Sequence, residues 1–134
     1  MPTPRRQFGD WGEALAREFL EKRSYTILGL NYRKRCGEID IVARREDVLH
    51  FVEVKTRTGS AGGFGSPEEA VGTRKQRRLV ATVRHYLFEL AYPEDTAWQI
   101  DVLSIQYFPA RRLARIRLTP SALDERALAE ENSD

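Results

Sequence analysis

The chain has 134 residues, of which 41% are hydrophobic and 31% are charged. This composition is typical of one globular domain that is long enough to bury its own core. No apolar run approaches the roughly 20 residues of a membrane span. The single cysteine, Cys36, excludes an intramolecular disulfide and a metal cage built from cysteines.

The charge is unevenly distributed along the chain. The formal net charge is +2, but residues 124–134 contain five acids and one base, so the other residues carry 21 bases against 15 acids. A basic body suits a polyanionic partner such as nucleic acid. The segment behind Arg5 and Arg6 is not apolar, so we expect no signal peptide, no membrane contact and a cytoplasmic location.

The first predicted element is a helix over residues 11–23. Asp10 is a suitable N-cap, and Glu13, three residues later, would complete a capping box. Apolar residues at helical spacing predict the buried stripe, namely Leu15, Ala16, Phe19 and Leu20.

A strand is predicted next, over residues 25–32, because β-branched and aromatic residues dominate it. Three cations follow, Arg33, Lys34 and Arg35, before the turn at Gly37. They could hold a phosphate backbone, or they could be a solvated turn.

Residues 38–43 and 49–56 are predicted to form two strands joined by a short charged turn. In the first strand, Glu38 and Asp40 alternate with isoleucines, and in the second, Glu53 and Lys55 alternate with valines. A two-residue or a four-residue turn gives the same register, in which paired residue numbers sum to 93. Asp40 would then lie opposite Glu53, and Glu38 opposite Lys55.

The pairing of Asp40 with Glu53 is unfavourable for folding alone. Two carboxylates about 5 Å apart repel by roughly 3 kcal/mol at an effective dielectric of about 20. A divalent cation removes this cost, since Mg²⁺ prefers oxygen ligands and is usually held by one or two carboxylates, waters and substrate phosphates. A lysine beside such an ion can position the attacking water or stabilise charge on phosphate. The competing interpretation is a solvated sheet face.

A glycine-rich loop follows the second strand of the hairpin, with four glycines between Gly59 and Gly65. Ser66, Pro67 and Glu69 then predict a helix start, and a helix of about 20 residues follows. Its apolar stripe comprises Leu79, Val80, Val83, Tyr86, Leu87 and Leu90. Its basic residues either contact phosphate without reading sequence or form a solvated face, and Lys75 and Gln76 are best placed to reach the carboxylates.

Two strands are predicted after this helix, over residues 98–107 and 113–118. The second has alternating arginines, which suits a sheet edge. Thr119 and Pro120 are expected to begin a short terminal helix that frays into the acidic end. The isolated His50 and His85 are interpreted as structural, and Asp101 is placed outside the set of direct metal ligands.

Several segments taken together carry a resemblance to a known family. They are Gly12-Glu13, Asn31-Tyr32-Arg33, Gly37-Glu38-Ile39-Asp40, Phe51 to Arg57, Phe64-Gly65 and Asp101-Val102. An Asp on one strand and Glu-x-Lys on the next resemble the core motif of the PD-(D/E)xK nuclease superfamily. The whole order, over residues 8–108, is similar to the YraN family, which resembles archaeal Holliday-junction resolvases.

The resemblance implies a site and a chemistry. Asp40 and Glu53 would bind Mg²⁺ or Mn²⁺, Glu13 would be a third carboxylate at the metal rather than only a cap, and Lys55 would complete the catalytic set. Arg33, Arg57, Lys75, Gln76 and Arg78 are the candidate nucleic-acid contacts. Family members carry an arginine and an aromatic residue before Asp101, where this chain has Gln99 and Ile100.

We therefore expect one α/β domain over residues 1–134, a three-layer restriction-endonuclease-like fold with a mixed five-stranded sheet flanked by helices. The expected function is a metal-dependent endonuclease acting on structured or branched DNA. The alternative is a non-catalytic nucleic-acid-binding module with the nuclease fold. DNA is favoured over RNA as the partner, and analogy with resolvases suggests a homodimer.

Overall fold

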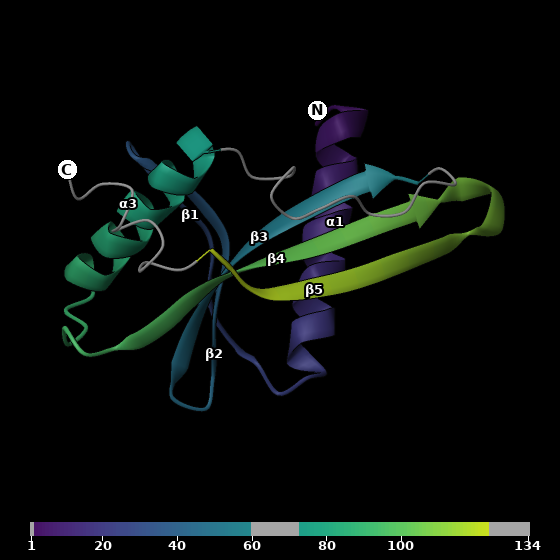
Figure 1. Cartoon of the computed structure of the whole chain (residues 1–134). Coiled ribbons are helices and arrows are strands. Elements are labelled where there is room, and N and C mark those ends of the chain that lie inside the picture. The colour runs from purple at the N-terminus through teal and green to yellow at the C-terminus, as the bar shows by residue number, and fades with distance from the viewer. Residues whose placement is uncertain (1, 60–72, 124–134) are drawn as a thin grey trace.

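Figure 1 shows the computed structural model of the chain, which describes residues 2–59 and 73–123. The described elements are, in order, α1 (Pro4–Glu21), β1 (Thr26–Lys34), β2 (Gly37–Arg45), β3 (Val48–Thr58), α3 (Thr73–Glu89), β4 (Ala97–Phe108), the 3-10 turn η1 (Pro109–Arg111) and β5 (Leu113–Leu123). No helix among these is long and apolar enough to cross a membrane.

The five strands form one mixed sheet in the order β1-β2-β3-β4-β5. β3 and β4 are parallel, with α3 in the connection between them, and all other neighbouring pairs are antiparallel. The predicted hairpin register is confirmed, because Ile41 pairs with Val52 and Arg45 with Val48. The sheet has a helix packed on each side, which is the predicted fold class and is consistent with a restriction-endonuclease-like fold.

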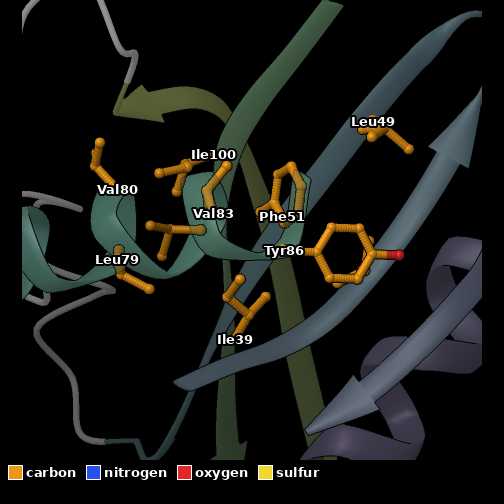
Figure 2. Close-up of a cluster of buried hydrophobic side chains, with 10 residues drawn as sticks. Ile39, Leu49, Phe51, Leu79, Val80, Val83, Tyr86 and Ile100 are labelled. Atoms are coloured by element: carbon orange, nitrogen blue, oxygen red, sulfur yellow. The ribbon is translucent and has the colours of Figure 1, made fainter. Parts of the chain in front are cut away.

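Each face of the sheet has its own hydrophobic core. Ala16 and Leu20 of α1 pack with Ile41, Val52 and other residues on one face. On the other face, Val83 and Tyr86 of α3 pack against Phe51 and neighbouring strand residues, as Figure 2 shows. Because alternate residues of a strand point to opposite faces, β3 supplies Phe51 to one core and Val52 to the other.

The predicted start of the first helix is wrong. The helix begins at Pro4, with Thr3 as N-cap, and the Thr3 Oγ1 accepts a hydrogen bond from the Arg6 backbone N–H at 3.1 Å. Threonine before a proline at the first helical position is a complete start signal of its own. Asp10 therefore lies inside the helix, and Glu13 has no capping role.

Two predictions near the ends of later elements are also wrong. Leu90 follows α3 and is 49% exposed, so it is outside the buried stripe. Residues 119–123 continue β5 instead of starting a helix, and β5 tolerates Pro120 because an edge strand has one row of N–H groups with no partner strand. The helix start at residues 66–69, most of the glycine-rich loop and the acidic end lie outside the described residues.

Candidate functional site

Asp40 lies where the regular alternation of β2 breaks. Ile39 packs in the core beneath α3, whereas Ile41 packs in the core beneath α1, although a regular strand would place both on one face. The described pairing of β2 with β3 ends at Ile41 and Val52. Next to that pair, the Asp40 Oδ2 accepts a hydrogen bond from the Val54 backbone N–H at 2.8 Å.

This geometry corrects one detail of the predicted hairpin. The pairs Asp40–Glu53 and Glu38–Lys55 are not part of the described ladder, because the carboxylate of Asp40 serves as the acceptor for β3 at this point. The prediction that Glu38 and Asp40 simply alternate with Ile39 and Ile41 fails for the same reason. A carboxylate that bridges two backbones has less freedom than one on an open sheet face.

Glu53 lies on the α3 side of β3 and is only 6% exposed. Its Oε1 forms an ion pair with the Nζ of Lys75, in the first turn of α3. A buried carboxylate requires such a partner, because a buried charge is tolerated when it is paired and hydrogen-bonded. The ion pair links the start of α3 to the middle of the sheet.

The two carboxylates line one pocket of about 700 Å³ between the sheet and α3. Its wall is made by Gly37, Glu38, Asp40, Glu53, Val54, Arg74, Lys75, Arg78 and Leu79. One side is therefore acidic and is supplied by β2 and β3, and the other is basic and is supplied by the first turns of α3. A phosphate group beside a cation would meet suitable partners on both sides.

The electrostatics of the pocket couple its acids and lysines. Burial, together with the charge of Glu53, raises the pKa of Asp40 to about 8. Burial lowers the pKa of Lys55, and the neighbouring charge of Lys75 lowers it further. The pKa of Lys75 is raised, because its contact with Glu53 outweighs the opposing effect of burial. Like charges held together in this way are typical of functional sites.

Glu13 approaches Asp40 from the α1 side of the sheet. It is hydrogen-bonded to Asn31 of β1, and its pKa is raised mainly by burial. Its charge also contributes to the raised pKa of Asp40. Asn31 has a left-handed backbone with φ of 51°, so β1 is irregular where it meets this glutamate.

The candidate nucleic-acid contacts are spread around the pocket. Lys75 and Arg78 line it, and the Arg78 Nε also donates a hydrogen bond to the backbone oxygen of Cys36 at 3.2 Å. The Arg33 Nε lies 3.0 Å from the Glu38 Oε1. Arg33, Arg57 and Gln76 do not line the pocket. Arg57 is exposed, and its charge acts on Lys55.

The donor set of the pocket, with two carboxylates, fits a hard divalent cation. Within residues 2–59 and 73–123, no group of three or more His, Cys, Asp or Glu side chains is arranged to hold a metal. Asp40 and Glu53 nevertheless interact directly through their charges in one pocket. Two carboxylates, with waters and substrate phosphate, are a usual protein contribution to a Mg²⁺ site.

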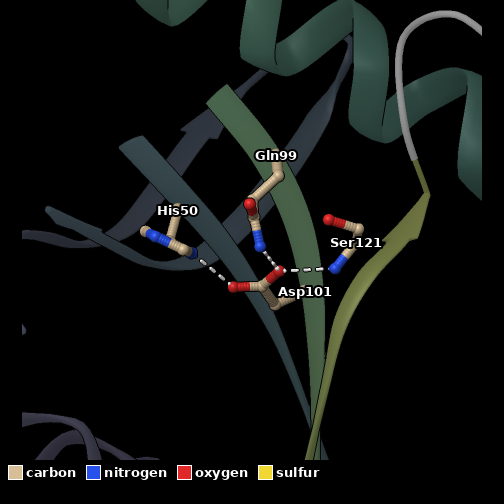
Figure 3. Close-up of polar contacts among 4 residues, drawn as sticks. All are labelled: His50, Gln99, Asp101 and Ser121. Carbon is tan, nitrogen blue, oxygen red and sulfur yellow. Dashed lines mark hydrogen bonds and ion pairs between the residues drawn. The ribbon is translucent and has the colours of Figure 1, made fainter. Parts of the chain in front are cut away.

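Both histidines and Asp101 belong to other contacts. The His50 Nδ1 donates to the fully buried Asp101, with 2.7 Å between the two atoms, and Gln99 and the Ser121 backbone also donate to it (Figure 3). The His85 Nδ1 lies 2.9 Å from the Tyr32 hydroxyl. None of these residues lines the pocket, which is consistent with a structural interpretation of the two histidines and with the placing of Asp101 outside the set of direct metal ligands.

Sequence reasoning missed two features of the pocket. Glu38 and Arg74 line it, although neither was among the candidate site residues. The sequence did contain a signal for Glu38, because it lies two residues before Asp40 in the same predicted strand, as a second carboxylate near the proposed site. The ion pair between Glu53 and Lys75 agrees with the prediction that Lys75, at the helix start, is well placed to reach the carboxylates, whereas Gln76 does not line the pocket.

Comparison with known proteins places the chain in a family. A family model described as "Uncharacterised protein family UPF0102" matches residues 12–105. A UPF0102 protein of Chloroflexus aurantiacus is 45% identical over 105 residues, which cover 78% of this chain and 83% of the relative. One from Roseiflexus castenholzii is 39% identical over 93% of this chain and 99% of the relative, and one from Symbiobacterium thermophilum is 44% identical over 87% and 96%. The matched region contains the acidic and the basic residues that line the pocket. The chain belongs to the UPF0102 family.

Proposed function

We propose that this protein is a metal-dependent endonuclease of the PD-(D/E)xK superfamily that hydrolyses phosphodiester bonds in structured or branched DNA in the cytoplasm. The observation that carries the proposal is the pocket in which Asp40 and Glu53 face the basic start of α3. The fold, the family and the order of the motif residues support it.

In this proposal, Asp40 of β2 and Glu53 of β3 would hold the ion, and the backbone carbonyl of Val54, next to Glu53 on β3, would be a third oxygen donor. Bound there, Mg²⁺ or Mn²⁺ would stabilise charge on the phosphoryl oxygens and favour ionisation of the attacking water. Glu13 contributes directly or through a water, from the α1 side.

The lysines and arginines supply the remaining functions. Lys55, whose pKa is lowered by burial, orients the attacking water and accepts its proton when neutral. Lys75 exchanges its contact with Glu53 for the substrate phosphate once the ion neutralises that carboxylate. Arg33, Arg57, Gln76 and Arg78 hold the flanking backbone, which fixes the scissile bond without reading sequence.

The test is cleavage of linear, flapped and four-way-junction DNAs, and of matched RNAs, with Mg²⁺, Mn²⁺ or a chelator. We expect metal-dependent cutting that Asp40→Asn and Lys55→Ala each reduce by about 100-fold or more, while both variants stay folded. Asp47→Asn is the matched control, because it makes the same change at an exposed acid in the turn of the same hairpin. Undiminished cutting by Asp40→Asn would remove this residue from the mechanism.

A non-catalytic nucleic-acid-binding module is the second candidate. It is favoured by the Lys75–Glu53 ion pair, in which a cation already neutralises one of the two carboxylates. A melting experiment separates the candidates, because a metal that binds only the folded protein raises its melting temperature. If neither Mg²⁺ nor Mn²⁺ raises that of wild type more than that of Asp40→Asn, the binding module is the better account.

A further inference from the structure

A set of basic residues continues from the pocket across the sheet toward its edge. The register pairs Lys55 of β3 with Ser104 of β4, and Ser104 with Arg117 of β5. Two positions further along β3, Arg57 pairs with Gln106, and Gln106 with Arg115. These six residues form two rows across three neighbouring strands, here called the basic rows.

All six side chains are on the face of the sheet that carries Glu53. The intervening residues, among them Val54, Leu103 and Ile116, pack in the core beneath α1, so their neighbours along each strand point to the opposite face. Figure 1 shows that this part of the sheet, unlike the part that packs against α3, lies away from that helix. Toward their carboxyl ends, β3 and β4 extend away from α3, β5 lies beside β4 in the opposite direction, and α1 crosses behind all three strands.

The rows have the charge and dimensions of a backbone-binding surface. Four of the six residues are basic and none is acidic, and Arg57, Arg115 and Arg117 are exposed. The outer strands are about 9.5 Å apart and the rows about 6.6 Å apart along the strands, so the four cations surround a narrow strip. The guanidinium of Arg115 lies over the Phe108 ring, 5.5 Å from its centroid, on the same face.

We propose that the basic rows bind the phosphate backbone of one nucleic-acid strand that leads away from the pocket. The proposal rests on the proposed function, because it takes the pocket as the position of the scissile phosphate. Glu53 and Val54 line the pocket, and Lys55 is the next residue of β3, so the rows begin where the pocket ends. Cationic side chains on the surface of a sheet favour contacts with phosphate that do not depend on sequence.

The first test is the salt dependence of binding, measured with chelator present so that no strand is cut. Removing two phosphate contacts makes the slope of log K against log[salt] shallower by about 1.8 for duplex or 1.4 for single-stranded DNA. We expect this change in Arg115→Gln/Arg117→Gln. The charge-preserving Arg115→Lys/Arg117→Lys should keep the wild-type slope, and Arg17→Gln/Arg44→Gln, which removes two exposed arginines elsewhere, should also leave it unchanged.

A second test locates the contact along the strand. Neutral methylphosphonates are placed one at a time on both sides of a fixed reference phosphate, and binding is compared between wild type and Arg115→Gln/Arg117→Gln. Substitution at the phosphates that the arginines contact should weaken wild type and have little further effect on the double variant, as expected for two coupled groups. Affected phosphates should cluster on one side of the cleaved bond.

The outcomes separate this inference from the proposed endonuclease. Cleavage with Mg²⁺ together with an unchanged slope in Arg115→Gln/Arg117→Gln would overturn the basic rows and leave the endonuclease in place. A shallower slope in Arg115→Gln/Arg117→Gln, without cleavage by any form of the protein, would support the basic rows as a binding surface and overturn the endonuclease. Absence of nucleic-acid binding by wild type would overturn the inference directly.

Discussion

The protonation of Asp40 is the residue-scale property on which the pocket depends. Its pKa rises from an ordinary value of 3.8 to about 8, because burial and the Glu53 charge both disfavour the carboxylate. Between these two values the folded chain holds a proton that the unfolded chain releases, so raising the pH through this window destabilises the fold. The contribution is fully favourable below pH 3.8 and lost above about pH 8.

We therefore predict that Asp40→Asn stabilises the metal-free protein at pH 8 and not at pH 4. The asparagine oxygen can still accept the Val54 N–H, but the side chain carries no charge. The melting temperature should rise by about 4 °C at pH 8, the shift that roughly 1 kcal/mol produces in a domain of this size. Asp47→Asn provides the control, and an equal rise at both pH values would contradict the assignment of the pKa.

The ion pair of Lys75 with Glu53 gives a second residue-scale prediction. Lys75→Gln leaves a nearly buried carboxylate without its cation, which should cost about 1–2 kcal/mol. The cost is smaller than for a fully buried pair, because the Lys75 side chain is 43% exposed. Denaturant unfolding measures it. Arg74→Gln, which removes the same charge from the same wall of the pocket, should cost less than 0.5 kcal/mol, an estimate typical of a surface change.

The same substitution tests competition between Lys75 and a metal. If a divalent cation binds Glu53, the Lys75 ammonium must leave that carboxylate, so Mg²⁺ should stabilise Lys75→Gln more than wild type. Melting curves over a Mg²⁺ titration give the comparison. An identical Mg²⁺ response in both proteins would show that the ion does not use Glu53.

At the scale of elements, α1 docks on β3 through a contact that requires glycine. A Cβ atom at Gly12 would lie 2.1 Å from the Thr56 Oγ1 and 2.9 Å from its Cγ2. The contact fixes the distance between the helix and the strand. It also sets the position of Glu13, the next residue, relative to Asp40.

We predict that Gly12→Ala destabilises the protein by about 1–3 kcal/mol through overpacking. Gly9→Ala, in the same helix with nothing within 4 Å of the added Cβ, should instead stabilise it by about 0.5–1 kcal/mol. Thr56→Ala should restore most of the loss in Gly12→Ala, since it removes two of the three close atoms. Denaturant unfolding of Gly12→Ala, Gly9→Ala and the double variant Gly12→Ala/Thr56→Ala checks this, and equal stability of the two single glycine variants would refute the close approach.

Some features of the elements follow from the sequence alone, and others depend on tertiary packing. The hairpin register could be predicted, because either turn length between β2 and β3 gives the same pairing. The break at Asp40 could not, because the apolar alternation of the sequence continues through it and only packing against two different helices separates Ile39 from Ile41. The start of α1 was missed because Asp10 and Glu13 imitate a capping box inside a helix that Thr3 already caps.

The site could be predicted in part, because some of its residues are close together in the sequence and others are not. Asp40, Glu53 and Lys55 lie on the two strands of one hairpin, so their closeness could be predicted, although the predicted pairs Asp40–Glu53 and Glu38–Lys55 lie outside the described ladder. The position of Lys75 at the start of the long helix was enough to predict that it approaches the carboxylates, but its specific contact with Glu53 depends on the parallel crossover that carries α3 over the sheet. The basic rows likewise need β4 and β5 to be in register, which the alternating arginines alone do not specify.

At the scale of the whole molecule, the buried Asp101 network holds together the strands that carry the site. Asp101 accepts three hydrogen bonds, from His50 of β3, Gln99 of β4 and the Ser121 backbone of β5. It is fully buried and does not line the pocket. One carboxylate thus links three strands from the face of the sheet opposite to Glu53, because its neighbours Ile100 and Val102 pack beneath α3, so stability and activity can be separated by mutation.

Asp101→Asn tests this separation. An asparagine has one acceptor oxygen and an NH₂ group, so the His50 Nδ1 must either lose its hydrogen bond or change tautomer to accept from the amide, at a cost of about 1–3 kcal/mol. Denaturant unfolding should show this loss, whereas DNA cleavage well below the melting temperature should stay within about threefold of wild type, or roughly 0.7 kcal/mol. Asp40→Asn should show the opposite combination, a stable protein without cleavage. If Asp101→Asn abolished cleavage while folded, Asp101 would have to act on the pocket through β4, and the separation of the scaffold from the site would be wrong.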